Sequence, residues 1–254
     1  MAVKNEPALT QNEFILKGIT KSYGDLRVLD GISLAVEENR IVAILGPSGC
    51  GKTTLLLLLA GSLLPDSGEI IGLTGKAVSF LFQEPRLLDW LTVAENIAFV
   101  LKDRFPPAEV EAKINAVLRR VELAEYGNAY PRRLSGGQRQ RAAMARAWAY
   151  PSRLLLMDEP YKSLDLGLKL ELIRQFLQLW TEEPRTVLYV THDIKEALLL
   201  ADEIYLLSTK PTVVRSRYAV PIPRSRRRLD DYTLLALERE ITAELLQEEE
   251  RHRS

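Results

Sequence analysis

Cysteine, histidine and net charge are all scarce in this chain of 254 residues. It has one cysteine, Cys50, and two histidines, His192 and His252. A single cysteine excludes a disulfide framework within the chain, so a reducing compartment suits the sequence. Lys plus Arg and Asp plus Glu each number 34, which gives a formal net charge of zero. This balance does not favour a broad electrostatic affinity for nucleic acid.

Long apolar runs are also missing. The longest apolar cluster covers residues 55–60, and Gly61-Ser62 interrupts it before Leu63-Leu64. A bilayer span needs about 20 apolar residues in succession, so no membrane-spanning helix is expected. Residues 1–11 are polar and lack the charged start and apolar stretch of a secretory signal. We therefore expect a protein that is soluble or is held at a membrane by a partner.

Short apolar runs alternate with helical patterns over most of the chain. Such alternation predicts an α/β fold with a mostly parallel sheet. The run at 41–45 is continuously apolar, as expected of a strand that is buried on both faces. The other expected strands are residues 14–19, 28–36, 70–71, 78–82, 154–157, 186–190 and 204–207.

The middle of the chain has a different, helical character. Apolar residues recur at helical spacing between Val110 and Val121, and Pro106-Pro107 fits the start of that helix. We therefore predict a helical insert at about 87–150 inside the α/β core. The other expected helices are the Leu-rich stretch after residue 53, residues 142–149 and residues 170–179.

A glycine-rich segment between an expected strand and an expected helix matches the phosphate-binding pattern G-x-x-x-x-G-K-[ST]. Glycines let successive backbone N–H groups turn toward phosphate oxygens, and the following helix adds the positive end of its dipole. Lys52 would supply a charge to the β- and γ-phosphates, and Thr53 a hydroxyl to Mg²⁺. These features predict a nucleoside triphosphate site. The segment is Gly46-Pro47-Ser48-Gly49-Cys50-Gly51-Lys52-Thr53.

The cysteine inside this loop has two interpretations. Free cysteine packs as a small hydrophobe, so Cys50 can be a filler. A thiol near a helix N-terminus can instead have a lowered pKa and be reactive. We predict that alkylation of Cys50 blocks ATP hydrolysis and that bound nucleotide protects the thiol.

Two further expected strands end in residues that suit hydrolysis. The strand at 154–157 leads into Asp158 and Glu159, and ligands bind at such strand ends in α/β sheets. Asp158 is placed to hold the Mg²⁺ shell, and Glu159 to orient or deprotonate the attacking water. His192 follows the strand at 186–190. It can contact the γ-phosphate, hold the water network, or be structural as a lone histidine usually is.

A second glycine-containing helix start lies at Leu134-Ser135-Gly136-Gly137-Gln138. Ser-Gly-Gly at the start of a helix makes another anion-binding N-terminus. A plain capped helix would explain the serine, but not two glycines followed by glutamine. One nucleotide does not need two phosphate cradles from one chain, whereas a face-to-face pair of chains would use both.

This segment resembles the LSGGQ signature of the nucleotide-binding subunits of ATP-binding-cassette (ABC) transporters, and the resemblance covers residues 12–225. It implies a P-loop NTPase core with an N-terminal antiparallel β subdomain and an inserted α-helical subdomain. It also implies a chain that hydrolyses ATP with Mg²⁺. In this family two copies enclose two ATP molecules. Each ATP lies between one chain's Lys52 loop and the signature of the other chain, Leu134, Ser135, Gly136, Gly137 and Gln138.

The resemblance also implies roles for single residues. Tyr23 looks like the aromatic that stacks on adenine, and His192 like the switch histidine. Gln83 looks like the glutamine that reaches Mg²⁺ and the water and signals to the membrane subunit. The segment Ser163-Leu164-Asp165 looks like the loop that crosses the dimer interface. The implied catalytic residues are Glu159, His192 and Gln83; the implied Mg²⁺ ligands are Thr53, Gln83 and Asp158; and the implied ATP-binding residues are Tyr23, 46–54 (ending in Thr54), Gln83, Asp158 and His192.

Residues 83–93 and the arginine-bearing tail at 223–228 are most similar to importers of nitrate, sulfonates and taurine. Those systems pair two such subunits with two membrane permease subunits and an external solute-binding protein. The chain would then lie at the cytoplasmic face of the inner membrane. It departs from the importer pattern at Tyr161-Lys162-Ser163, where Phe-Gly-Ala is expected. It also lacks the usual Thr-Arg soon after Asp165. These departures leave the interface contacts and the solute open.

Other functions remain alternatives to an importer subunit. One is a soluble cassette ATPase that acts on DNA or ribosomes. DNA-repair relatives separate the two halves by a long coiled coil, for which the gap between Thr54 and Leu134 has no room. Translation relatives usually carry two cassettes, and one is present here. A non-catalytic binding module would tolerate the loss of Lys52, Glu159 or His192, and all are present. We therefore expect an importer ATPase without a nucleic acid partner.

The tail, residues 226–254, follows a basic run. The run consists of Arg224, Arg226, Arg227 and Arg228, and apolar residues at helical spacing follow at Leu234, Leu237, Ile241 and Leu245. We interpret the tail as a basic linker and a docked amphipathic helix. A contact with a lipid surface is the alternative.

Overall fold

The computed structural model describes residues 13–73, 77–162 and 164–253. The chain divides into two compact units, which we call the first unit (residues 1–76 and 185–254) and the second unit (residues 77–184). Within the described residues, no helix is both long and apolar enough to cross a membrane.

The first unit contains a three-stranded antiparallel sheet in the order β2-β1-β4. Alternate residues of β2, such as Ile32, Leu34 and Val36, are buried, while their neighbours are more exposed. This period of two is typical of a sheet with one covered face. The strands are β1 (Glu13–Tyr23), β2 (Leu26–Glu37) and β4 (Ser67–Ile71).

The first unit also holds four strands in the order β7-β3-β8-β9. β3 pairs in parallel with both β7 and β8, and β9 pairs antiparallel with β8. Every residue of β3 and β7 is buried, which explains the continuous apolar run at 41–45. The alternating polar strand β9 is absent from the sequence-based expectation. The strands are β3 (Ile41–Leu45), β7 (Thr186–Thr191), β8 (Glu203–Leu207) and β9 (Val214–Ala219).

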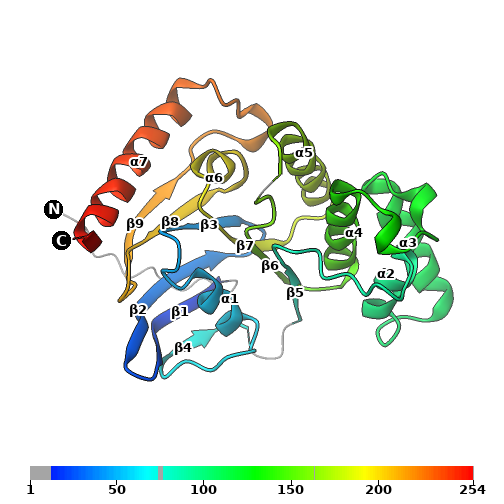
Figure 1. The fold of residues 1–254 in the computed structure, drawn as a ribbon, viewed down its shortest axis with the longest axis horizontal. Helices are drawn as coiled ribbons and strands as arrows, with labels where there is room; N and C mark the ends of the chain where they lie inside the picture. Colours follow the sequence, from blue (N-terminus) through cyan, green and yellow to red (C-terminus); the bar gives the residue numbers. More distant parts are fainter. Residues whose placement is uncertain (1–12, 74–76, 163, 254) are drawn as a thin grey trace. The chain divides into compact units, whose positions relative to one another are not determined.

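Three helices complete the first unit: α1 (Lys52–Leu59), α6 (Ile194–Leu200) and α7 (Tyr232–Arg253). Helix α7 lies beside β9, and its carboxylates bind that strand (Figure 1). Glu244 accepts hydrogen bonds from the hydroxyls of Ser216 and Tyr218. Glu248 pairs with Arg215 at 3.1 Å. The tail helix is thus docked, as one of the two interpretations predicted.

Two arginines of the basic run before α7 bind to other residues of the first unit. Arg227 donates to the carbonyls of Leu198, Leu199 and Ala201, and these carbonyls lie at the C-terminal end of α6. A guanidinium there satisfies backbone groups that the helix itself leaves without partners. Arg224 pairs with Asp202 at 2.9 Å. Both arginines therefore have structural partners, which favours the linker interpretation over a lipid contact.

Among its described residues, the second unit pairs two parallel strands with four α-helices (Figure 1). Helices α2, α3 and α4 pack together between residues 93 and 149, within the range predicted for a helical insert. The division at 12–225 and 226–254 stays a prediction. The elements are β5 (Val78–Leu81), α2 (Val93–Leu101), α3 (Pro107–Arg120), α4 (Gly136–Ala149), β6 (Leu154–Asp158) and α5 (Leu166–Glu182).

The structure confirms the predicted mixed α/β fold, with an antiparallel sheet and a group of mostly parallel strands. Helix α3 begins at Pro107, where Pro106-Pro107 predicted a start. The short helices α2 and α6 were not predicted one by one. Their seven or nine residues carry too few turns for a clear period.

Candidate functional site

The phosphate loop of the first unit connects the end of β3 to the start of α1. Gly49 has φ 76° and Gly51 has φ 109°, which side chains other than hydrogen rarely allow. A Cβ on Gly51 would also stand 2.7 Å from Val28 Cγ1. A Cβ on Gly46 would stand 3.0 Å from Cys50 Sγ. Positive φ thus explains Gly49, close packing explains Gly46, and both explain Gly51.

Lys52 begins α1, and its side chain is buried inside this loop. Its ammonium donates to the carbonyls of Gly46 at 2.8 Å and Pro47 at 2.9 Å. The first turn of α1 contains no acidic residue. The loop therefore presents an ammonium and a helix N-terminus together, which is an environment that favours an anion.

Cys50 is 2% exposed, and its neighbours fill the space around the thiol. Burial raises the pKa of this thiol and outweighs the nearby Lys52 ammonium, which lowers it. The suggestion that the helix N-terminus makes Cys50 acidic is therefore wrong, because desolvation dominates. The structure favours the filler interpretation.

His192 lies next to the phosphate loop at the edge of the same parallel strands. Leu45 at the end of β3 pairs with Thr191 at the end of β7, so Gly46 and His192 follow at neighbouring strand ends. His192 is exposed at this edge. Tyr23, at the end of β1 in the same unit, is 48% exposed, and the Lys21 ammonium lies 6.0 Å from the centre of its ring.

Gln83, Asp158 and Glu159 share an edge in the second unit. Leu81 of β5 pairs with Met157 of β6, so the segments that follow the two strands begin side by side at the same edge. The three side chains offer amide and carboxylate oxygens, which are the donors that Mg²⁺ prefers. Parallel pairing thus brings His192 to the phosphate loop in the first unit, and Gln83 to Asp158 and Glu159 in the second unit.

The turn after β6 is held by buried partners. Gln140 of α4 donates to the Pro160 carbonyl at 2.6 Å, and Tyr161 is 1% exposed. Glu159 has φ 42°, an uncommon value for a residue with a side chain. Its carboxylate pairs with Lys162 at 2.7 Å. Neither Gln140 nor Lys162 was among the predicted site residues, although the departure from the importer pattern at residue 162 was a signal.

The signature segment starts α4 with a complete capping box. Ser135 Oγ accepts from the Gln138 N–H at 3.2 Å, and Gln138 Oε1 accepts from the Ser135 N–H at 2.9 Å. A Cβ on Gly137 would stand 2.9 Å from Leu168 Cδ1, whereas a Cβ on Gly136 would meet no atom within 4 Å. Leu134 is 4% exposed, so within the chain it acts as a packing residue.

The predicted dimer-interface loop is only partly described. Ser163 lies outside the described residues. Asp165 is the N-cap of α5 and accepts from the Leu168 N–H at 3.0 Å. Because Leu168 also lies against Gly137, the start of α5 and the signature helix are packed together within the second unit.

The segment that follows Gln83 is fixed by two polar residues that the sequence did not point to. Asn96 is fully buried, and its amide accepts from the Leu88 N–H and donates to the carbonyls of Leu88, Leu91 and Thr92. Arg146 of α4 donates to the carbonyls of residues 85 and 86 at 3.0 and 2.9 Å. Burial lowers the pKa of Arg146, a cost that these bonds offset. We call Asn96 and Arg146 the loop clamp.

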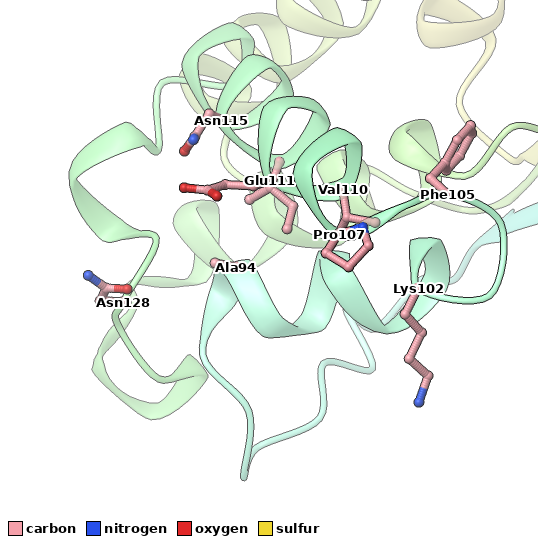
Figure 2. A pocket seen from close by; sticks show the side chains of 9 residues that line it. Ala94, Lys102, Phe105, Pro107, Val110, Glu111, Asn115 and Asn128 are labelled. Atoms are coloured by element: carbon pink, nitrogen blue, oxygen red, sulfur yellow. The ribbon is translucent and has the colours of Figure 1, made fainter.

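A pocket of about 420 Å³ lies between α2 and α3 in the second unit. Figure 2 shows Lys102 and Phe105 on one side of the pocket and Glu111 and Asn128 on the other. It contains none of the predicted ATP-binding residues. The nucleotide site that the motifs predict is therefore separate from this pocket.

A family model described as ABC transporter matches residues 29–162, a range with the phosphate loop, the signature and Glu159. The chain belongs to the ABC transporter family. The range stops short of His192, whose place beside the phosphate loop comes from the strand pairing. The family assignment that the LSGGQ signature implied is confirmed.

Relatives of this chain include import ATP-binding proteins. A sulfate/thiosulfate import ATP-binding protein, CysA of Gloeobacter violaceus, is 43% identical over 76% of this chain and 59% of its own length. This chain thus spans less than two thirds of that relative. An aliphatic sulfonates import ATP-binding protein, SsuB 2 of Pseudomonas aeruginosa, is 40% identical over 92% of this chain and 85% of its own length.

Among solved structures, the dimeric ATP-binding cassette MJ0796, in a post-hydrolysis state bound to ADP and Pi, is similar with a TM-score of 0.72. It is 30% identical, and the match covers 83% of this chain and all of that one. The P-loop cassette fold expected from the signature is therefore confirmed.

Proposed function

We propose that this chain binds and hydrolyses ATP to energise an ABC importer. The observation that carries the proposal is the phosphate loop, in which glycines at positive φ, a buried Lys52 and the start of α1 form one anion-binding turn. The names of the relatives, which are import ATP-binding proteins, support the transport assignment.

Each predicted site residue has its own role in ATP binding or hydrolysis. Lys52 binds the β- and γ-phosphates, and its two carbonyl contacts hold its ammonium inside the loop. Glu159 orients the attacking water and accepts its proton while the water oxygen bonds to the γ-phosphorus and the bond to ADP breaks. His192, one strand away from the loop, is placed to contact the γ-phosphate. Tyr23 offers an exposed ring for adenine.

Mg²⁺ fits the oxygen donors that the motifs supply. Gln83 and Asp158 leave neighbouring strands at one edge, and Thr53 is an exposed residue at the start of α1. When bound, Mg²⁺ would neutralise phosphate charge during the transfer. Few protein ligands are needed, because Mg²⁺ in such sites keeps waters and phosphate oxygens in its shell.

A second copy of the chain would complete each site. Ser135 and Gly136 are exposed at the start of α4, and the space beside Gly136 is open. Exposed N–H groups at a helix start suit the phosphates of a nucleotide on another chain. The dimeric form of the similar cassette supports this pairing. Leu164 and Asp165 would lie at the same interface.

The remaining partners follow from the importer assignment. The chain would bind integral-membrane permease subunits at the cytoplasmic face of the inner membrane and act indirectly with an extracytoplasmic solute-binding protein. We propose a nitrate, sulfonate, taurine or similar small-anion importer. The sulfate and sulfonate names among the relatives support an oxyanion. The permease and binding protein, rather than this chain, would select the solute.

The proposed activity is tested by ATP hydrolysis of the purified chain with and without Mg²⁺. Glu159→Gln should retain ATP binding, lose nearly all hydrolysis and accumulate an ATP-bound dimer that size-exclusion chromatography detects.

Lys52→Ala should weaken nucleotide binding by about tenfold or more, since a charge-assisted bond contributes about 1.5–3 kcal/mol. Glu125→Gln and Lys102→Ala, both exposed on the second unit, are matched controls. Normal turnover of Glu159→Gln would refute its assigned role.

A further inference from the structure

The proposed catalytic carboxylate already has a cation beside it. Lys162 Nζ lies 2.7 Å from Glu159 Oε2. The side chain of Glu159 is 14% exposed and that of Lys162 is 40% exposed. The pair is therefore shielded on the carboxylate side and open to water on the lysine side.

The backbone makes this contact a built-in feature of the turn. The Lys162 N–H donates to the Glu159 carbonyl at 3.1 Å, which closes a turn of four residues. The middle of the turn is anchored, because Tyr161 is buried and the Pro160 carbonyl accepts from Gln140 at 2.6 Å. The two side chains emerge from a fixed frame, so little backbone freedom is lost when they pair.

Lys162 also departs from the importer pattern that the rest of the sequence resembles. The importer pattern expected from the resemblance has glycine at the position of Lys162, and glycine carries no charge. The contact of Glu159 with a lysine at 2.7 Å is thus an addition to the expected site. It places an ammonium on one of the two oxygens through which the carboxylate would accept the proton of the attacking water.

We propose that Lys162 is a positioning residue that holds Glu159 in an ion pair and thereby slows ATP hydrolysis by the chain. The inference rests on the proposed role of Glu159. The pair competes with the water for the carboxylate. Because Lys162 is partly exposed, the pair is weak enough to open and acts as a restraint, not as a block.

The test measures kcat, KM and ATP affinity of the purified full-length chain with Lys162→Ala, Lys162→Gly and Lys162→Arg. Loss of the ammonium in the Ala and Gly variants should raise kcat about two- to five-fold, the range for release of a partly exposed ion pair. KM and ATP affinity should stay unchanged, since Lys162 is assigned no contact with nucleotide. Lys162→Arg keeps a cation beside Glu159 and should stay near the native kcat.

The double variant Glu159→Gln/Lys162→Ala separates this inference from the proposed function. If the restraint acts through Glu159, the double variant should hydrolyse ATP no faster than Glu159→Gln alone. The restraint is overturned if Lys162→Ala raises kcat equally in the Glu159→Gln background. It is also overturned if Lys162→Ala alone leaves kcat unchanged or lowers it, or if Lys162→Arg raises kcat as much as Lys162→Ala does. Active Glu159→Gln would instead overturn the catalytic role of Glu159, on which both depend. Thermal unfolding of every variant confirms that the compared proteins are folded.

Discussion

At the residue scale, the two signature glycines have different reasons to lack a side chain. Gly137 is crowded by Leu168, whose Cδ1 would stand 2.9 Å from an added Cβ. Gly136 is exposed, does not have a positive φ, and would place a Cβ in open space. Nothing within the described residues therefore requires glycine at 136. A ligand or a second chain that approaches this position would supply the reason.

Replacement of Gly136 should affect the free energy of unfolding and the rate of ATP hydrolysis differently. Gly136→Ala should leave the free energy of unfolding equal or raise it by up to about 1 kcal/mol, because alanine restricts the unfolded chain and favours helix. The same variant should lower ATP hydrolysis, since its methyl group occupies the space proposed for the nucleotide of the partner chain. Urea unfolding and ATP turnover measure the two effects. Full activity would show that the open space is not used by nucleotide.

The buried thiol of Cys50 predicts a pH dependence of labelling. Because burial raises its pKa, the folded chain keeps the thiol neutral where an unfolded chain ionises it, above about pH 8.5. Iodoacetamide should therefore label native protein more slowly than unfolded protein at about pH 8, with a rate that still rises beyond about pH 9. By linkage, the folded state loses stability as the pH increases through this range. Equal labelling rates in native and unfolded protein would contradict the burial effect.

Complete alkylation of Cys50 should abolish ATP hydrolysis, and bound nucleotide should protect the thiol. The thiol stands against Gly46, where even a Cβ would come within 3.0 Å, so an attached group has to displace the phosphate loop. Mass spectrometry of the labelled chain and its ATP turnover check this outcome. Unchanged turnover after full labelling would mean that the loop accommodates the added group.

At the element scale, the loop clamp connects α2 and α4 to the segment after Gln83. Its members satisfy backbone groups of residues 85–92, none of which lies in a helix or strand. A loop that is held by side chains in this way depends on them for its conformation. The clamp thus fixes the segment that follows Gln83, the residue proposed to signal to the permease.

Removal of the clamp should destabilise the second unit. Asn96→Ala removes the amide's bonds to the Leu88 N–H and the Leu91 carbonyl, so we expect a loss of about 1–3 kcal/mol of unfolding free energy. Arg146→Lys, which keeps the charge but not the forked donors, should recover only part of the loss caused by Arg146→Ala. Urea denaturation measures both. Arg104→Ala, which removes one exposed hydrogen bond to Tyr150, is the control and should change stability by less than about 0.5 kcal/mol.

At the scale of the whole molecule, each proposed active site combines Lys52 of one chain with Ser135 of another. This arrangement predicts complementation between two inactive variants. Lys52→Ala and Ser135→Arg should each be inactive alone. In a mixed dimer both defects fall in one site, and the other site keeps native residues from both chains.

Equal mixing of the two variants should recover about a quarter of native turnover, because random pairing makes half of the dimers mixed and each mixed dimer has one intact site. ATP hydrolysis of the mixture measures the recovery. A mixture of Lys52→Ala with Glu159→Gln is the control. There the only chain with an intact Lys52 carries the Glu159 defect, so no site is complete. Absence of recovery in the first mixture would argue against shared sites or require that both sites act together.

Local patterns in the sequence determined the elements that carry the chemistry. The apolar run at 41–45 is β3 with the same bounds, and the predicted glycine turn follows it. Such features depend on neighbours in the chain, because glycine freedom and burial of a strand on both faces leave a local signature. The short helices and the polar strand β9 depend on distant partners, and they were not predicted.

The tertiary structure alone decided how side chains from separate elements meet. Parallel pairing aligned Leu45 with Thr191 and so brought His192 next to the phosphate loop. Packing and desolvation decided that Cys50 has a raised pKa. The turn after β6 decided that Lys162 meets Glu159. Residue types and their spacing carry motif chemistry, whereas burial and charge contacts depend on atoms that only the folded chain brings together.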